Sequence, residues 1–330
     1  MPIIRAVAAF AVFSSCCELV AQSPEPTTES IAQQRVVLVV GAEGAPEYGE
    51  MFRKWAGDWQ QAAENANAQL QMIGIEPTDD SAAADRDVLQ TKLKESVEEL
   101  SDDATLWLVL LGHGTFDGKL AKFNLRGADV SSAELAEWLK PLTCSVVIIN
   151  SSASSGPFIN ALSGPNRVVV TATRSGAEQN FARFGEYLSR AMAAEDVDLD
   201  KDEQTSLLEA FIAGAKGVAE FYESDARLVT EHALLDDNGD SLGTAADWFR
   251  GVRAVQAAKE GAEPDGLRAN QIVLHRRGSE AALSDDDRNL RDALEAQLND
   301  LRQRKAELPE DQYYTELEAI VAQIARIYQR

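Results

Sequence analysis

The chain has 330 residues, of which 45% are hydrophobic, so it is long enough to bury a full core as one large domain or two smaller ones. Its formal net charge of −23 argues against nucleic acid or anionic lipid as a partner, because either would require a basic surface. Calcium, or a basic peptide or protein, fits this negative field better.

Residues 1–21 have the features of an export signal peptide. Arg5 gives a positive start, the apolar run "AVAAFAVF" follows, and "LVA" offers small residues for cleavage. The run is too short to cross a bilayer, so we expect an exported protein, periplasmic or extracellular, that is not integral to a membrane. Cys16 in "FSSC" is an alternative processing point that would give a lipoprotein. Residues 22–34 read as a polar linker, and Cys144 remains as the one cysteine certainly within the folded part, which excludes a disulfide framework there.

Between residues 35 and 173, apolar β-branched runs alternate with segments whose hydrophobic residues have helical spacing. This alternation predicts an α/β fold, with a mainly parallel sheet and helices on both faces. In such sheets a site lies where the strands end, at their carboxyl edge. In chain order, we expect a strand at 35–44, a helix at 50–67, strands at 69–75 and 105–114 with a helix at 85–100 between them, a helix at 131–142, and strands at 144–150 and 166–173.

The chain after residue 265 has a different pattern. Residues 266–283 form a connector, in which "QIVLHRR" predicts a strand before a charged turn, and residues 284–330 predict an antiparallel pair of amphipathic helices broken at Pro309. This C-terminal helical hairpin is either a cap packed on the domain or an arm for oligomerisation or partner contact. Its apolar positions are Leu290, Leu294, Leu298, Leu301, Tyr314, Leu317, Ile320, Ile324 and Ile327.

Two strands end in residues that could carry chemistry. The strand at 105–114 ends in "LLGHGTFDG", which places His113 between two glycines, and the strand at 144–150 runs into the serines of "IINSSASSGPF". An imidazole and a hydroxyl could therefore converge at one edge of the sheet. The alternative is that Gly and Ser stand there only because strand-to-loop turns favour them.

The order of these motifs resembles the caspase-like fold, and within it the legumain-type cysteine peptidases, over residues 35–190. "VVLVVGAEG" looks like the first strand and glycine turn of that family, "WLVLLGHGTFDGKL" like its histidine motif, and "VVTATRSGAEQNFA" like its fifth strand and the following loop. The resemblance implies a caspase-like or legumain-like domain over residues 35–265, with His113 as the catalytic imidazole.

The chain departs from the family at the nucleophile. A match without gaps places Asn150 at the family's acidic or amide position, Ser151 at the small one and Ser152 where the cysteine belongs. Cys144 cannot substitute, because it lies at the start of the strand and so at the opposite edge. A serine hydroxyl is far less acidic than a thiol and needs a well-placed base and oxyanion hole, so ordinary cysteine-peptidase activity is not expected.

The loop after the first strand departs as well. In legumains it carries an asparagine, then Arg and His, which help to recognise an asparagine or aspartate side chain. The same match puts Glu47, Gly49 and Glu50 at those positions. A ligand bound there, with Asn150 nearby, should therefore be neutral or basic.

These departures favour a pseudopeptidase that binds or scaffolds a peptide or protein. The first alternative is an active hydrolase in which Ser152, or Ser151 if the match slips by one, is the nucleophile and His113 the base. Its oxyanion donors would be backbone N–H groups around His113 and either Gly114 or Ser152. The second alternative is a structural envelope protein that acts through the helical hairpin.

An acidic insertion at 196–247 contains two stretches with the spacing of calcium-binding loops. In the first, Glu203 fills a turn position normally taken by glycine; the alternative is an acidic helix-start loop. In the second, Asp247 falls at the twelfth position; the alternative is an Asn-Gly turn. We expect no cofactor other than Ca²⁺. The candidate ligands are Asp198, Asp200, Asp202, the Gln204 carbonyl, Ser206 and Glu209 in the first stretch, and Asp236, Asn238 and Asp240 in the second.

Overall fold

The computed structural model describes residues 33–76, 84–194, 196–256 and 262–329. The predicted signal peptide, the alternative lipidation site Cys16 and all but two residues of the predicted linker lie outside these ranges. Within them, no helix combines the length and the apolar character needed to cross a membrane.

A seven-stranded sheet forms the centre of the molecule, in the order β10-β9-β8-β7-β3-β1-β2. The five strands from β8 to β2 are parallel, β9 is antiparallel to β8, and β10 is antiparallel to β9. The predicted α/β fold with a mainly parallel sheet is therefore confirmed. The strands are β1 (Gln34–Val40), β2 (Gln69–Ile73), β3 (Thr105–Leu111), β7 (Ser145–Asn150), β8 (Arg167–Thr171), β9 (Leu234–Asp236) and β10 (Thr244–Ala245).

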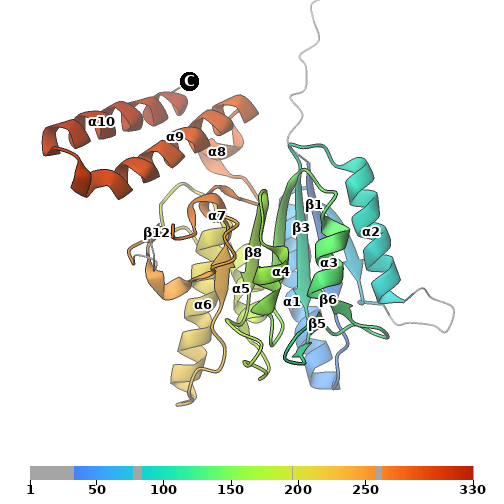
Figure 1. The fold of residues 1–330 in the computed structure, drawn as a ribbon. Helices are drawn as coiled ribbons and strands as arrows, with labels where there is room; N and C mark the ends of the chain where they lie inside the picture. The colour runs from blue at the N-terminus through green and yellow to red at the C-terminus, as the bar shows by residue number, and fades with distance from the viewer. Residues whose placement is uncertain (1–32, 77–83, 195, 257–261, 330) are drawn as a thin grey trace, which may run out of the picture. The chain divides into compact units, whose positions relative to one another are not determined.

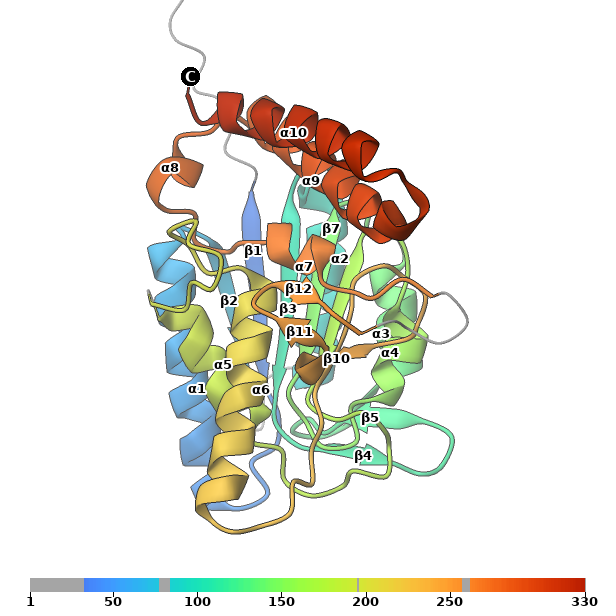
Figure 2. The same ribbon diagram turned by 90° about the vertical axis from the view of Figure 1, so that its left-hand side faces the viewer.

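Helices cover both faces of this sheet (Figures 1 and 2). The middle of each central strand is apolar because alternate residues enter two different cores: Val36 and Leu38 face one, Val37 and Val39 the other. The first core is closed by α1 (Pro46–Asn65), α5 (Phe184–Ala193) and α6 (Leu207–Ser224). The second is closed by α2 (Asp85–Glu99), α3 (Ser132–Leu139) and α4 (Pro157–Leu162).

A small antiparallel sheet at the carboxyl edge was not predicted. It consists of β4 (Gly114–Phe116), β5 (Ala121–Phe123) and β6 (Val130–Ser131), directly after the histidine motif. Asn124 N donates to His113 O at 3.0 Å, and Ala42 N donates to Asn124 O at 3.0 Å. The small sheet therefore ties the loop after β1 to the backbone of His113. A second ribbon pairs β11 (Phe249–Arg250) with β12 (Arg253–Ala254).

The C-terminal helices lie beyond the amino edge of the sheet (Figure 1). They are α7 (Leu267–Gln271), α8 (Gly278–Ala281), α9 (Asp285–Gln303) and α10 (Glu310–Ile327), with a 3₁₀ turn at Arg304–Glu307. The predicted pair of helices is confirmed, with α9 and α10 side by side. The strand predicted in the connector is wrong. Only its first residue, Gln271, belongs to a helix, α7, and Val273 keeps a single bridge, to Ser206, while the Val273 carbonyl accepts from Gln34 Nε2 at 3.2 Å.

Candidate functional site

The carboxyl edge of the sheet brings the ends of β3 and β7 together. The two strands are parallel neighbours, and their register pairs Leu110 with Asn150. Ser151 N extends this pairing by donating to Leu110 O at 3.0 Å. His113 and Ser152, which follow the two strands, therefore leave the sheet at the same edge.

The Ser152 hydroxyl is enclosed. Ser152 is 0% exposed, and its Oγ donates to Asn150 Oδ1 at 2.6 Å, while its backbone N donates to the same oxygen at 3.0 Å. A side chain at Gly114 would start 2.5 Å from Ser152 Oγ, so the glycine backbone lies directly against the hydroxyl. The hydroxyl proton is committed to Asn150, and neither a substrate nor water reaches the oxygen.

The His113 ring is held by a different set of contacts. Its Nε2 lies 3.2 Å from the backbone carbonyl oxygen of Glu43, and because a carbonyl can only accept, Nε2 carries the proton. Three aromatic rings surround the imidazole, with centroid distances of 4.9 Å to Tyr48, 5.2 Å to Phe52 and 5.9 Å to Phe181. Among the described residues, no hydrogen bond joins His113 to Ser152.

The pleat of the sheet explains this separation. Ile149 faces the core under α1, so the alternation turns Asn150 and Ser152 toward the other face. His113 contacts α1 through Tyr48 and Phe52, and is therefore on the α1 side. The imidazole and the Ser152 hydroxyl leave the same edge toward opposite faces.

Ser151 is the hydroxyl on the His113 side, but it is buried in packing. Ser151 is 1% exposed, and a side chain added at Gly185 of α5 would start 2.8 Å from Ser151 Cβ and 2.9 Å from the Trp55 ring. Ser151 Oγ and Asn150 Nδ2 have no hydrogen-bond partner among the described residues. Two buried polar atoms at the end of β7 are thus left unsatisfied, which costs stability.

The remaining hydroxyls of the serine run form hydrogen bonds that link the end of β7 to the loop after β8. Ser154 has a φ of +55°, and its Oγ donates to Gly176 O at 3.1 Å. Ser155 Oγ lies 3.1 Å from Thr173 Oγ1 and accepts from Thr173 N at 3.2 Å. These serines therefore hold a turn together.

The start of α1 forms an acidic rim beside His113. Glu47 and Glu50 are exposed on its first turns, whereas Gly49 is buried against the carboxylate of Glu43. Glu43 in turn lies 3.5 Å from Arg53 and supplies the carbonyl that holds His113. Tyr48 and Phe52 are the residues of α1 that face His113, and Glu50 lies about half a helical turn from both, so it is on the other side of the helix.

The sequence alone predicted neither the aromatic contacts of His113 nor the contact of a second histidine, His232, with Glu178. His232 Nδ1 lies 2.6 Å from Glu178 Oε1, and Glu178 also forms an ion pair with Arg174 at 3.2 Å. This cluster joins the loop after β8 to the segment before β9. The aromatic spacing in α1 was visible in the sequence, but Phe181 and Glu178 stand in a loop without periodicity, so no local signal marked them.

The first acidic loop brings its aspartates together. One carboxylate oxygen each of Asp198, Asp200 and Asp202 lies within 4.8 Å of the others. Ser206 and Glu209 instead form the capping box of α6, in which Glu209 N donates to Ser206 Oγ at 3.2 Å and Ser206 N to Glu209 Oε2 at 2.8 Å. Burial raises the pKa of the Glu209 carboxyl. Burial, and then the charge of Asp202, raise the pKa of Asp200.

The second acidic loop follows β9. Asp236 Oδ1 accepts from Gly239 N at 3.1 Å, Asn238 Oδ1 from Asp240 N at 2.9 Å, and Asp240 Oδ1 from Leu242 N at 2.7 Å. Asp247, the candidate twelfth position, lies in the 3₁₀ turn Ala246–Trp248. Burial raises the pKa of Asp236. In both loops, side chains at alternate positions turn inward.

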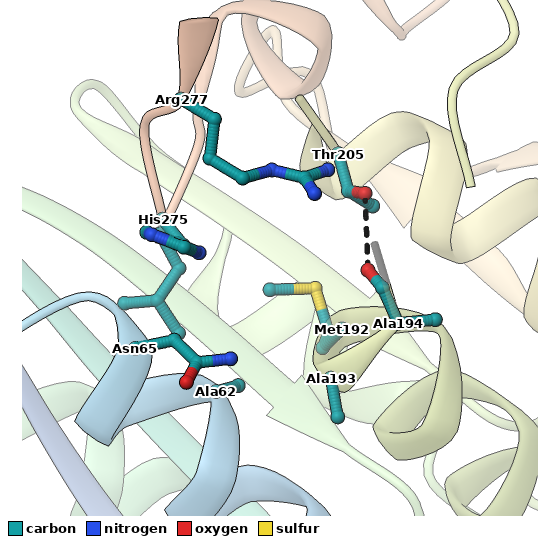
Figure 3. A pocket seen from close by; sticks show the side chains of 9 residues that line it. Ala62, Asn65, Met192, Ala193, Ala194, Thr205, His275 and Arg277 are labelled. Atoms are coloured by element: carbon teal, nitrogen blue, oxygen red, sulfur yellow. Dashed lines mark hydrogen bonds between the residues drawn. The ribbon is translucent and has the colours of Figure 1, made fainter. Parts of the chain in front are cut away.

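Two cavities differ in what they could hold. The one in Figure 3 has a volume of about 10 Å³, and it lies where His275 and Arg277 of the connector meet the ends of α1 and α5. It has room for about one water molecule. A second cavity, of about 400 Å³, lies beside the serine run and is large enough for a ligand side chain. Its lining includes Pro157, Ile159, Asn160, Arg174, Leu234 and Leu242.

No protein-family model matches the chain, and no curated protein sequence does. Among solved structures, the chain is similar to the Drosophila initiator caspase Dronc, at 16% identity over 72% of this chain and 94% of that chain, with a TM-score of 0.42. It is similar to drICE at 9% identity over 62% of this chain and 87% of that chain, with a TM-score of 0.38. It is also similar to caspase-1 from Spodoptera frugiperda, at 9% identity over 62% and 86% of the two chains, with a TM-score of 0.42. Similarities at this level say nothing about the site, whose role depends on the contacts within this chain.

Proposed function

We propose that the protein is a pseudopeptidase of the caspase-like type, which binds a peptide or protein segment at the carboxyl edge of its sheet and does not cleave it. The observation that carries this proposal is the Ser152 hydroxyl, which is 0% exposed and donates to Asn150 Oδ1. A serine nucleophile needs a base that takes its proton and an open path to the substrate. Both are lacking at Ser152 as the chain is folded.

The second hydroxyl, Ser151, gives no better nucleophile. It shares the α1 side with His113, but it is 1% exposed and packed against Gly185 and Trp55. His113 Nε2 already donates to the Glu43 carbonyl. Activity at Ser151 would require α5 to move away from the strand end, which would open the core under α1.

The ligand is expected to carry neutral or basic side chains. Glu43, Glu47 and Glu50 are exposed on the segment that leads from β1 into α1, and the whole chain carries a formal charge of −23, so an acidic peptide would be repelled. The cavity of about 400 Å³ next to the serine run offers room for one side chain of such a peptide. Because this cavity is lined by α4 and the exposed carboxylates belong to the α1 side of the sheet, a bound segment would have to cross the carboxyl edge to reach both.

Titration with short extended peptides tests this proposal. We expect peptides with Lys or Arg at the centre to bind more tightly than the same peptides with Asp or Glu, as measured by fluorescence anisotropy. The double substitution Glu47→Gln and Glu50→Gln should weaken binding about 5-fold, because each exposed charge pair contributes about 0.5 kcal/mol. Glu64→Gln, at the exposed far end of the same helix, is the matched control and should change nothing.

Mass spectrometry of the same peptides after incubation separates binding from hydrolysis. Intact peptides are the expected result. Peptides cleaved by the unmodified protein but not by His113→Ala would refute the pseudopeptidase, and equal affinity for acidic and basic peptides would refute the acidic rim as the recognition surface.

A further inference from the structure

The two acidic loops, which come before and after α6 in the chain, have positive φ values at the same two positions. At the fourth and sixth positions, counted from Asp198, Lys201 and Glu203 have φ values of +69° and +72°. Counted from Asp236, Gly239 and Ser241 at the same positions have φ values of +81° and +66°. Lys, Glu and Ser rarely adopt positive φ, so the strain is tolerated at matching places in both loops.

The hydrogen bonds of the first aspartate also match. Asp198 Oδ1 accepts from the fourth residue, Lys201 N, at 2.6 Å, and Asp236 Oδ1 accepts from its fourth residue, Gly239 N, at 3.1 Å. In the first loop the second oxygen of Asp198 is also engaged, because Oδ2 accepts from Glu203 N at 3.2 Å, whereas Asp236 Oδ2 has no donor among the described residues. In the first loop, one carboxylate oxygen each of Asp198, Asp200 and Asp202 lies within 4.8 Å of the others.

Two buried oxygens at these loops lack a donor. Asp236 is 1% exposed, and its Oδ2 has no hydrogen-bond partner among the described residues. Gln204, which is 3% exposed, donates through Nε2 to Asp202 Oδ2 at 2.9 Å, while its Oε1 is likewise without a partner in the described part of the chain. A buried oxygen without a donor is costly, and a cation bound at the loop would stabilise it.

We propose that each loop binds one Ca²⁺ ion, and that the two ions fix the short helix α7 between them. The first ion would take carboxylate oxygens from Asp198, Asp200 and Asp202, and the second side-chain oxygens from Asp236, Asn238 and Asp240. The donors are all oxygen and come from loops without a rigid octahedral frame, which suits Ca²⁺ better than Mg²⁺ or a transition metal.

Side chains from both loops hold α7. At the first loop, Asn270 of α7 donates to Asp200 Oδ2 at 3.4 Å and accepts from Ser206 Oγ at 3.3 Å. At the second loop, Asp237 Oδ2 accepts from Gly266 N at 3.0 Å and from Ala269 N at 2.8 Å, which caps the start of α7. An ion in each loop would keep Asp200 and Asp237 where these bonds form.

The helix α7 is in turn hydrogen-bonded to the C-terminal helices. Gln271 at its end donates to Asp292 O at 3.2 Å and to Glu295 Oε2 at 3.0 Å, both on α9. The ions would therefore determine how firmly the hairpin of α9 and α10 is attached to the sheet. The first loop and α7 lie at the amino edge and His113 at the carboxyl edge, so the first site is separate from peptide binding, whereas Leu242 at the end of the second loop lines the cavity of about 400 Å³.

Calcium titration of the full chain, freed of metal with a chelator, tests the proposal. Isothermal titration calorimetry should give two ions per chain, one in Asp200→Ala, one in Asp240→Ala, and none in the double variant, because alanine removes the ligand oxygen that asparagine would keep. Asp200 and Asp240 are exposed, so these variants should fold, which far-UV circular dichroism verifies. Asp286→Asn, an equal loss of charge at an exposed position on α9, should keep both ions.

Stability and hydrogen exchange supply the second readout. Ca²⁺ at 100 times its Kd should raise the melting temperature by about 5 °C, and the same concentration of Mg²⁺ should raise it much less. Amide exchange of Leu267–Gln271 should slow with Ca²⁺ in the unmodified chain and not in the double variant. Binding that persists in the double variant would overturn the two sites, and binding without slower exchange in α7 would overturn the connection to that helix.

Discussion

At the residue scale, neighbouring serines at the end of β7 have opposite environments. Ser152 Oγ donates to Asn150 Oδ1 at 2.6 Å, whereas Ser151 Oγ is buried without a partner among the described residues. The two hydroxyls differ because consecutive residues of an extended chain point to opposite faces. Two neighbouring serines therefore contribute differently to the free energy of folding.

Alanine substitutions should separate the two serines. Ser152→Ala removes a buried hydrogen bond and should lower the free energy of unfolding by about 1 kcal/mol. Ser151→Ala removes an unsatisfied hydroxyl and should raise the free energy of unfolding by about 1 kcal/mol. Urea denaturation of the three proteins measures both changes. A loss of stability in Ser151→Ala would show that this hydroxyl has a partner after all.

The sequence could predict which residues gather at the carboxyl edge, but not what their polar atoms contact. His113 and Ser152 follow neighbouring parallel strands, and that arrangement is readable from two apolar runs. The partner of His113 is Glu43, which lies 70 positions earlier in the chain, and the ring is packed by Phe181 from a loop without periodicity. Such contacts depend on where loops settle after the sheet has formed, and no local pattern encodes them.

At the element scale, the long strands and helices were predictable because burial in the core leaves a clear pattern of apolar residues in the sequence. The four inner parallel strands β1, β3, β7 and β8 are mostly apolar, and the helices that cover them have one apolar face. The strands β4 to β6 and β9 to β12 have two or three residues each, too few for any periodicity. The strand predicted in the connector was wrong for another reason: Val273 and Leu274 are buried against the domain as irregular chain after α7, with a single bridge from Val273 to Ser206, and burial alone gives the same apolar run in the sequence.

The helix α3 illustrates how a cap adds pH-dependent stability. Its capping box joins Ser131 and Glu134, and hydrogen bonds from the Ser131 side chain, then Arg86, lower the pKa of Glu134 to about 2. Because the folded pKa lies below the ordinary 4.5, the cap stabilises the fold above that pH and loses its effect as the pH falls toward 2.

Replacing Glu134 should reveal this dependence. Glu134→Ala should lower the free energy of unfolding by about 1 kcal/mol at neutral pH, and the difference from the unmodified chain should shrink between pH 4.5 and 2. Thermal unfolding over that pH range measures it. Glu137→Ala, at an exposed position on the same helix, is the control. A difference that stays constant down to pH 2 would contradict the capping role of the carboxylate.

At the scale of the whole molecule, the two edges of the sheet are separate in function. The carboxyl edge holds His113, the serine run and the acidic rim, whereas the amino edge holds the acidic loops, α7 and the C-terminal helices. Arg268 of α7 donates to Ser145 Oγ at the start of β7, and Asn150 and the serines lie at its other end. Substitutions of Asp198, Asp200 or Asp202 in the first acidic loop should therefore leave peptide binding unchanged.

The central claim is that this edge has the layout of a peptidase site without a working nucleophile. Labelling of the full chain with a fluorophosphonate, followed by mass spectrometry of the peptide that contains Ser151 and Ser152, tests it most directly. The structure predicts no adduct on either serine, because both hydroxyls are buried and neither is hydrogen-bonded to His113. An adduct on Ser151 or Ser152 that disappears in His113→Ala would contradict the account.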